Sequence, residues 1–384
     1  MERGSGHNDK LDLWKCVAIY SVIFIHILLP GQIGVAVNCL ARFAVPLFFL
    51  SAGFFSWRSP PRVLARRTVR TAGLLLFACL ALLSLGCAMA RHGGASMGAY
   101  LLGRFTWANA ASLVLWQLFP LPYSWPLWFL AALLMIYLMW WGLTALLRSH
   151  LPHRLLAVLA LGLLAVHLVL GEGRSLQGLA VDSVRIRNVW LDGLPFFLLG
   201  TWMGSQRERI EALRPGWLWL GAAAGSLLAL WERNRTEFLD LHVGTVLAAV
   251  CVMAACVAGP AVKSPVLRRT ACRCGRELTF YIFAFHVPIY GVMKEWSDTV
   301  PGFAWAMERS WLLPFLVAVL STLLAIGLNG GAAWLRRRIR GGTRTCTSFR
   351  PSRGPMPWPV GWGTRTRWSI SGRSMGSWRS STGW

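Results

Sequence analysis

Two titratable residues in the first apolar segment are placed to carry out proton-transfer chemistry. Lys15 and His26 are eleven residues apart, and eleven helical steps of about 100° complete three turns plus about 20°. Both side chains therefore lie on one helix face, about 16 Å apart along the axis. An imidazole that titrates near neutral pH suits general-base catalysis on a hydroxyl group, and ionisable residues at membrane depth often mark a site. We expect His26 and Lys15 to be catalytic.

Each of these residues also has a plainer interpretation. Lys15 could extend toward the membrane boundary as an inner-side positive charge, and His26 could be a hydrogen-bonded packing residue. Asp12, one turn before Lys15, could pair with it or with another helix end, and it is kept as a substrate-binding candidate. His286 could equally serve packing or function. His167 lies in a featureless apolar run and is expected to be structural.

The elements that hold these residues are predicted to be membrane helices. Hydrophobic residues make up 55% of the 384-residue chain and charged residues only 14%, whereas a soluble globular protein carries about 25% charged residues. This composition argues against a soluble enzyme. Apolar windows of about 20 residues predict an all-α, polytopic integral membrane protein with about ten transmembrane helices. The predicted helices cover residues 13–30, 43–57, 72–90, 125–147, 154–170, 190–204, 215–231, 242–261, 278–294 and 311–335.

The basic residues that give the chain its net charge of +24 are distributed in agreement with this predicted topology. With the N-terminus inside, the inner segments hold 22 Lys and Arg residues and the outer segments hold nine, as the positive-inside rule requires. No cleavable signal peptide is expected, because Lys15 and His26 interrupt the first apolar run. We expect an integral protein of a bacterial plasma membrane with both termini in the cytoplasm. The charge pattern does not favour a nucleic-acid partner.

The end of the chain differs in composition from the rest. Residues 341–384 form a Gly-, Ser-, Arg- and Trp-rich stretch without acidic residues, which predicts a disordered tail after a membrane domain spanning 1–340. Its interleaved Arg and Trp could contact nucleic acid or an anionic membrane surface, but a functionless extension is the favoured interpretation. Six of the nine cysteines lie in apolar runs, and Cys272 and Cys274 form an isolated pair. No metal site is therefore expected.

Several motifs resemble those of the acyltransferase 3 family of membrane acyltransferases. Asp12-Leu-Trp-Lys15, followed after ten residues by His26, is similar to the family's first-helix signature. In that signature a basic residue, more often Arg, precedes an essential His by this interval. The segment Arg42-Phe-Ala-Val-Pro-Leu-Phe-Phe-Leu-Ser51-Ala-Gly-Phe-Phe resembles the second-helix pattern, with an additional Ala between Ser and Gly.

Three further segments extend this resemblance over residues 9–338. Trp125-Pro-Leu-Trp128-Phe-Leu resembles a motif at the start of a central helix. Arg187-Asn188, ahead of Gly193-Leu-Pro-Phe-Phe-Leu-Leu-Gly, is similar to the family's Arg-Asn and Pro-Phe-x-x-Leu-Gly pattern. The late segment Gly275-Arg-Glu-Leu-Thr-Phe-Tyr-Ile-Phe-Ala-Phe-His286 also resembles its counterpart.

The resemblance implies transfer of an acyl group, typically acetyl, from a cytosolic acyl-CoA to a hydroxyl of a carbohydrate, lipid-linked sugar or small metabolite of the cell envelope. Acyl-CoA is then a donor substrate, no cofactor is bound, and the lipid bilayer is the remaining partner. His26 would take the proton from the acceptor hydroxyl, and Lys15 would hold the anionic donor at a cationic inner mouth. The expected substrate-binding residues are Asp12, Arg42, Ser51, Trp128, Arg187, Asn188 and His286.

Two other functions stay open at this stage. Lys15, His26 and His286 could line the path of a transporter of a small metabolite such as an amino acid. Two homologous halves would mark such a protein, and no convincing internal repeat is present. The other alternative is a membrane-anchored binder of nucleic acid or lipid surfaces that acts through residues 341–384.

Overall fold

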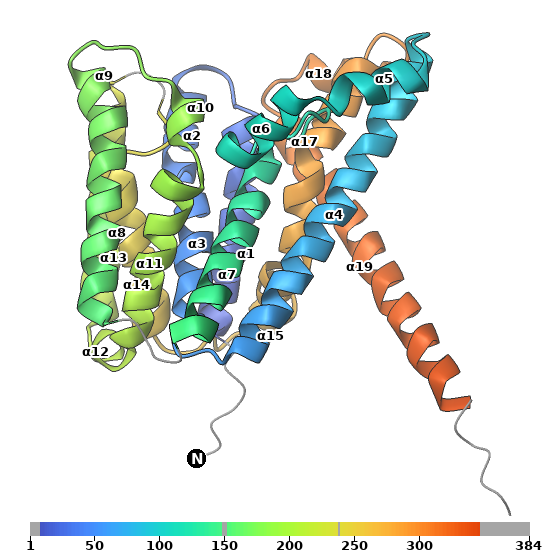
Figure 1. Cartoon of the computed structure of the whole chain (residues 1–384). Coiled ribbons are helices and arrows are strands. Elements are labelled where there is room, and N and C mark those ends of the chain that lie inside the picture. Colours follow the sequence, from blue (N-terminus) through green and yellow to red (C-terminus); the bar gives the residue numbers. More distant parts are fainter. Residues whose placement is uncertain (1–7, 148–151, 237–238, 346–384) are drawn as a thin grey trace, which may run out of the picture. The chain divides into compact units, whose positions relative to one another are not determined.

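The described part of the chain is built from helices alone. The computed structural model describes residues 8–147, 152–236 and 239–345, and within these ranges there is no strand (Figure 1). The all-α fold class is therefore confirmed. The chain divides into two compact units, residues 1–334 and 335–384. Of the second unit, the structure describes only the end of one helix.

Each of the ten predicted membrane segments contains a helix. In chain order these helices are α1 (Asp9–His26), α3 (Ala44–Phe54), α4 (Pro61–His92), α7 (Trp128–Leu147), α8 (His153–Leu168), α11 (Leu194–Ser205), α13 (Pro215–Arg233), α14 (Val243–Ala258), α17 (Thr279–Glu295) and α19 (Leu313–Thr345). Helix α19 ends five residues into the predicted tail. The remainder of that tail, residues 346–384, lies outside the described residues.

Fewer of these helices than predicted are long and apolar enough to cross a membrane by themselves. Among the described residues five stretches are: Gly31–Phe54, Pro61–His92, Trp125–Leu147, His153–Leu176 and Leu313–Arg338. Helices α11, α14 and α17 have only 12, 16 and 17 residues. Helix α1 has 18 residues, but its first seven include four charged side chains. The chain is thus an all-α membrane protein, with five clear spans among the residues that the structure describes.

The described residues also form several short helices. Within the predicted ranges 125–147 and 190–204 the chain begins with η1 (Trp125–Leu127) and η3 (Val189–Gly193). Other short helices lie wholly or mostly outside the predicted ranges: α2 (Gly31–Ala41), α5 (Met97–Arg104), α6 (Trp107–Trp116), η2 (Val169–Gly173), α9 (Arg174–Leu176), α10 (Ser183–Ile186), α12 (Arg207–Glu211), α15 (Pro265–Arg269), α16 (Ala271–Arg273), η4 (Cys274–Leu278) and α18 (Pro301–Met307). Polar caps begin some of them. The side chains of Ser96 and Thr106 accept hydrogen bonds from backbone N–H groups of α5 and α6, as N-caps do.

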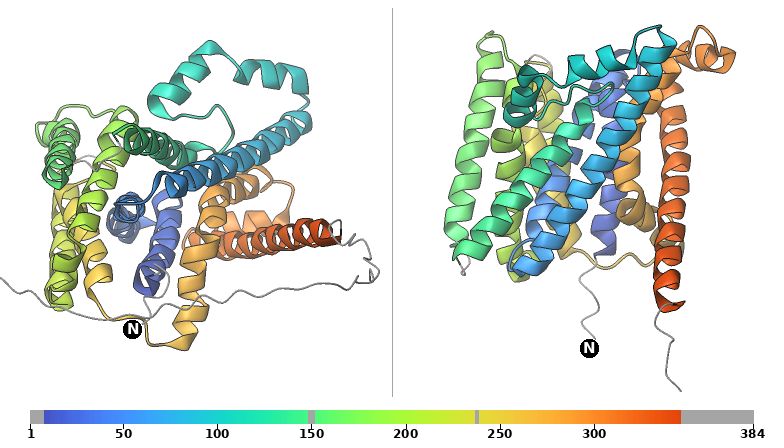
Figure 2. Two further views of the ribbon diagram at one scale, coloured as in Figure 1. Left: turned by 60° about the horizontal axis from the view of Figure 1, so that its bottom comes forward. Right: turned by 45° about the vertical axis from the view of Figure 1, so that its right-hand side comes forward.

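Helix α1 is anchored within the first unit at both of its ends. It packs against α2, α3, α14, α17 and η4 (Figure 2). At its start, Asn8 caps the helix and donates from Nδ2 to the carbonyl oxygen of Cys256 on α14, at 2.9 Å. At its end, Asn38 on α2 donates from Nδ2 to the carbonyl oxygen of Ile25, also at 2.9 Å. The last carbonyls of a helix lack intrahelical partners, so Asn38 fixes the turn that carries His26.

Glycines allow α3 and α11 to pack closely. A Cβ atom added to Gly53 would collide with the backbone of Phe197, and one added to Gly200 would collide with the backbone of Leu50. The two helices make one of the most extensive contacts in the first unit. Gly53 and Gly200 therefore permit the close approach of these two helices. This contact fixes α3, which carries Phe48 and Ser51 of the site described below.

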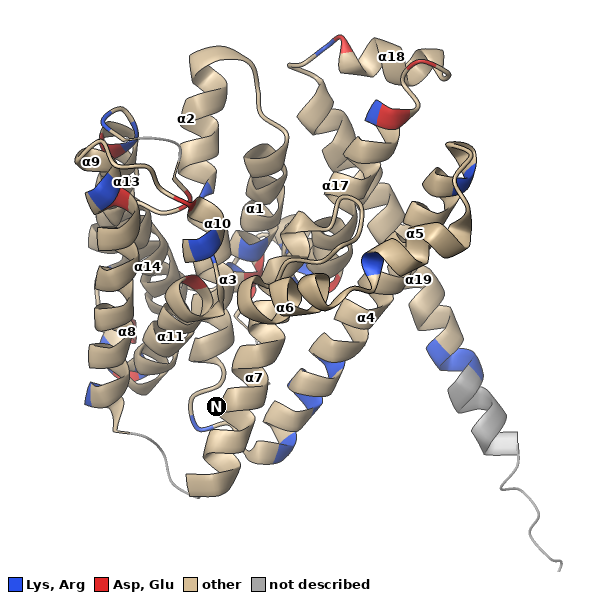
Figure 3. Ribbon diagram, turned by 45° about the horizontal axis from the view of Figure 1, so that its top comes forward, with Lys and Arg blue, Asp and Glu red and all other residues tan. Residues whose placement is uncertain are grey.

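The connecting segments lie at two opposite ends of the first unit. In Figure 1 the start of α1, the start of α4, α12 and α15 lie at the lower end, whereas α5, α6, α9, α10 and α18 lie at the upper end. The Lys and Arg residues at the start of α1, at the start of α4, on α12 and on α15 belong to these lower segments, which we call the basic end. Long helices between the two ends are nearly free of charge, and α7 carries no charged residue (Figure 3).

Candidate active site

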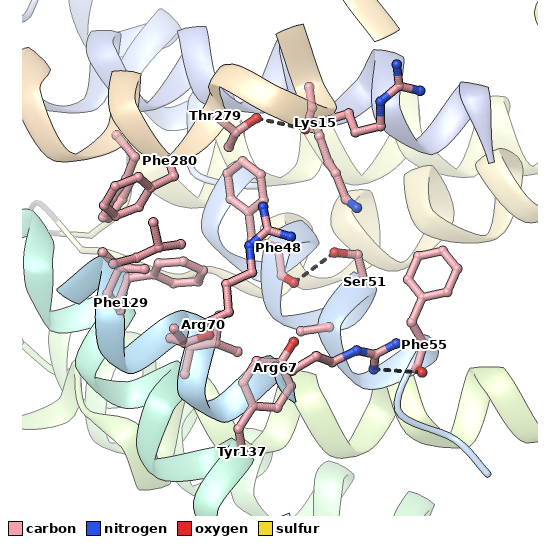
Figure 4. A pocket seen from close by; sticks show the side chains of 18 of the residues that line it. Lys15, Phe48, Ser51, Phe55, Arg67, Arg70, Phe129, Tyr137, Thr279 and Phe280 are labelled. Atoms are coloured by element: carbon pink, nitrogen blue, oxygen red, sulfur yellow. Dashed lines mark hydrogen bonds between the residues drawn. The ribbon is translucent and has the colours of Figure 1, made fainter. Parts of the chain in front are cut away.

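A cationic pocket opens at the basic end between α1, α3, α4, α7 and α17. Its volume is about 510 Å³, and three of the predicted site residues, Asp12, Lys15 and Ser51, line it. Arg67 and Arg70 from α4, and Arg276 from η4, also line it. Figure 4 shows the side chains of Lys15 from α1 and of Arg67 and Arg70 from α4 directed into the same space. The pocket therefore concentrates positive charge that arrives from distant parts of the sequence.

Short-range contacts hold several of these side chains in place. The Lys15 Nζ atom lies 4.0 Å from Asp12 Oδ1 and 5.5 Å from the centre of the Phe55 ring. Arg67 donates to the carbonyl oxygen of Phe55 at 2.8 Å. The Ser51 hydroxyl donates to the carbonyl oxygen of Phe48 at 2.9 Å, so its hydrogen is used within α3. Of the two alternatives expected for Asp12, the structure contains the pairing with Lys15.

Arg67 and Arg70 line the pocket, although from the sequence they were expected only to be inner-side charges. Their spacing in the sequence could have indicated this role, because residues three apart on a helix share a face. Two arginines at this spacing near the start of an apolar helix can bind one anion together. Their position across the same pocket from Lys15 could not be predicted, because it depends on how α4 packs against α7 and α17.

A second, smaller pocket holds His26. Its volume is about 40 Å³. The predicted site residues Arg42, Trp128 and Arg187 line it together with His26. Two acidic residues that were not predicted, Asp192 and Asp240, complete its polar lining. This pocket brings together residues from α1, the end of α2, the start of α7 and the segment before α11.

Asp240 connects the two arginines of the His26 pocket. Its carboxylate forms an ion pair with Arg42 and a second, at 3.5 Å, with Arg187. Arg42 Nε also donates to Asn38 Oδ1 at 3.2 Å, the same Asn38 that holds the last turn of α1. The guanidinium of Arg187 lies 5.6 Å from the centre of the Trp128 ring. A buried ionic network thus reaches from Asp240 to the helix end that carries His26.

His286 lies beside His26. The two ring centroids are 5.3 Å apart. His286 Nδ1 lies 3.0 Å from the carbonyl oxygen of Ile282 and 2.9 Å from that of Phe283. Because a carbonyl oxygen can only accept, Nδ1 carries the hydrogen and Nε2 presents a lone pair. Within the described residues this buried Nε2 atom has no hydrogen-bond partner, so it can accept a hydrogen bond from a bound group.

Two phenylalanines belong to both pockets. Phe129 from α7 and Phe283 from α17 line the cationic pocket and also the His26 pocket. Their ring centroids are 5.3 Å apart in an edge-to-face arrangement. Lys15 and His26, predicted on one face of α1, therefore contribute to two adjoining pockets on either side of this aromatic pair.

Two of the predicted site residues, Asn188 and His286, line neither pocket. The Asn188 Oδ1 atom accepts from the backbone N–H groups of Trp190 and Leu191 at 2.8 and 3.0 Å, which caps η3. His167 is also held by a backbone contact, from Nδ1 to the carbonyl oxygen of Leu191 at 2.9 Å. In the described residues no three His, Cys, Asp or Glu side chains are grouped to hold a metal ion.

The sequence pattern of the acyltransferase 3 family, described as an acyltransferase domain, matches residues 8–330. The chain belongs to this family. The match includes every residue that lines the two pockets. No curated protein and no solved structure is detectably similar to the chain. As a member of the acyltransferase 3 family, the protein is a membrane acyltransferase, and the two adjoining pockets are its candidate active site.

Proposed function

We propose that the protein transfers a short acyl group, acetyl, from cytosolic acyl-CoA to a hydroxyl of a carbohydrate or similar small acceptor. The observation that carries this proposal is the junction of the two pockets. A cationic pocket suited to an anionic donor adjoins, across Phe129 and Phe283, a pocket that holds a histidine suited to general-base catalysis. An acyl group that crosses this junction comes within reach of His26.

The donor is proposed to bind in the cationic pocket. Coenzyme A carries several phosphate charges, and Lys and Arg side chains bind phosphate through charge-assisted hydrogen bonds. Lys15, Arg67, Arg70 and Arg276 provide these groups. The basic end is then the cytoplasmic side, which agrees with the positive-inside rule. Under this proposal the ten helices cross a bacterial plasma membrane and both termini are cytoplasmic.

His26 is proposed to act as the general base. Its imidazole takes the proton from the acceptor hydroxyl while the oxygen attacks the thioester carbonyl carbon. The new C–O bond forms, the C–S bond breaks, and the leaving thiolate recovers the proton from His26 to give free coenzyme A. His286 Nε2, held as an acceptor by its Nδ1–H bonds to the backbone, stabilises the protonated His26 ring.

The acceptor is proposed to approach from the upper end. Arg42 and Arg187 line the His26 pocket and are fixed by Asp240, so they present hydrogen-bond donors at defined positions. A few fixed polar groups in an otherwise apolar pocket give a small ligand its orientation. Trp128 supplies an apolar wall beside Arg187. Asn188 contributes indirectly, because it caps the η3 turn that carries Asp192.

The test is an acyl-transfer assay with purified protein in detergent. Acetyl-CoA labelled in the acetyl group is incubated with a panel of oligosaccharides containing glucose, galactose, rhamnose or N-acetylglucosamine. The proposal expects ester-linked label in a glycan and one free thiol released for each ester formed. In a parallel vesicle assay, uptake of a labelled amino acid without acyl transfer would instead support the transporter alternative.

A further inference from the structure

The aromatic pair between the two pockets is tightly held. Phe129 and Phe283 are 8% and 5% exposed and belong to the main hydrophobic core. The Phe129 ring centroid is 4.6 Å from that of Phe49, which is fully buried and packs in turn against Trp128 at 6.2 Å. On the other side, Phe283 lies 6.2 Å from the His286 ring. Neither ring can turn aside without displacing a buried neighbour.

The space beyond this pair is small. The pocket on the His26 side has a volume of about 40 Å³, against about 510 Å³ on the cationic side. Its apolar wall includes Val22, Ile25 and Pro46. A thioester carbonyl that reaches His26 brings its acyl chain into this region. Each added methylene must then occupy volume that packed side chains already fill, and overpacking a filled core is unfavourable.

We infer that Phe129 and Phe283 set the length of the acyl chain that the protein transfers, selecting acetyl over longer acyl groups. The inference rests on the proposed acyl-CoA function and assigns these two rings as its specificity-determining residues. The two rings leave too little volume in the His26 pocket for a longer acyl chain. The phosphates of every acyl-CoA, in contrast, bind the cationic pocket in the same way. Chain-length selection is therefore separate from donor binding.

The test is a competition between acetyl-CoA and butanoyl-CoA in one tube, with the same oligosaccharide panel as acceptor. The ratio of the two esters formed gives the ratio of kcat/KM and does not depend on how much of the protein is folded. Phe129→Leu, Phe129→Ala and Phe283→Leu are compared with the wild type. Phe48→Leu is the matched control, because Phe48 lines only the cationic pocket and its ring is 5.9 Å from that of Phe129.

The wild type is expected to favour acetyl. The Phe129 and Phe283 variants are expected to raise the butanoyl-to-acetyl ratio by about tenfold or more, since one methylene in a closed pocket changes kcat/KM by about 10- to 200-fold. The ratio for Phe48→Leu is expected to stay within about twofold of the wild type. An active wild type whose ratio is unchanged in all three variants, or which prefers butanoyl, would overturn this inference alone. A wild type inactive with both donors would overturn the proposed function.

Discussion

Replacing Asp240 with asparagine should destabilise the protein far more than removing an exposed carboxylate. Asp240 is 11% exposed and pairs with Arg42, which is 8% exposed, and with Arg187, which is 22% exposed. The substitution keeps the size of the side chain and removes its charge. Two largely buried guanidinium groups then lose the anion that both of them face.

The size of the effect follows from this geometry. Breaking a fully buried ion pair by removing one partner costs about 3–5 kcal/mol. The second pair is longer, at 3.5 Å, and Asp192 lines the same pocket, so we take the lower end, about 3 kcal/mol. The entropy of unfolding is about 2.1 cal/mol/K per residue, so for a chain of 384 residues 1 kcal/mol corresponds to about 1.2 °C. Asp240→Asn should therefore lower Tm by about 4 °C.

The assay is thermal unfolding of the purified protein in one detergent, with Asp182→Asn as the control. Asp182 pairs with Arg185 at 3.0 Å, but the two side chains are 55% and 73% exposed. An exposed pair contributes at most about 1 kcal/mol, so this variant should unfold within about 1 °C of the wild type. Equal Tm values for the two variants would refute the reasoning that the Asp240 network is energetically important.

Three further predictions concern the cationic pocket and the helix packing. Arg70→Ala should raise the KM for acetyl-CoA by about three- to tenfold, because the donor loses about 1 kcal/mol of binding free energy. Arg62 lies outside the pocket, so Arg62→Ala should leave the KM unchanged. Equal KM values for both variants would argue against a donor site on α4. Lys15→Ala should lose most transfer activity and Lys15→Arg should retain it, because arginine keeps the charge; equal loss in both would contradict a donor-binding role. Gly200→Ala should lower Tm by about 1–4 °C, since overpacking costs about 1–3 kcal/mol. Gly142→Ala has open space around its Cβ position and should leave Tm unchanged; an unchanged Tm for both variants would show that the α3–α11 contact adapts.

The helices were predictable because each is a local property of the sequence. A stretch of apolar residues predicts a helix independently of the segments that pack against it. Each of the ten predicted ranges therefore coincides with a helix. The number of clear spans was less predictable, since α11 and α14 are shorter than a full membrane crossing. The helix α2 was missed because residues 31–41 carry small and polar side chains in addition to apolar ones.

The site was predictable only where a motif kept its residues close in sequence. Lys15 and His26 share α1, and their spacing was sufficient to single them out. Asp240 could not be found in this way, because it lies in a connecting segment and acquires its role from contacts with Arg42 and Arg187. The aromatic pair likewise depends on α7 and α17 meeting in space. Distant packing therefore supplies the parts of the site that the sequence alone does not reveal.

The central claim is that His26 is the base that makes acyl transfer possible. The most direct measurement is the rate of label transfer from acetyl-CoA to glycan by the His26→Ala variant, with the exposed His153→Ala variant as the matched control. General-base catalysis contributes about 10²- to 10⁴-fold, so the His26 variant should lose at least about a hundredfold in kcat while its KM for acetyl-CoA changes little. The His153 variant should match the wild type. A folded His26→Ala protein that transfers acetyl at the wild-type rate would contradict the account.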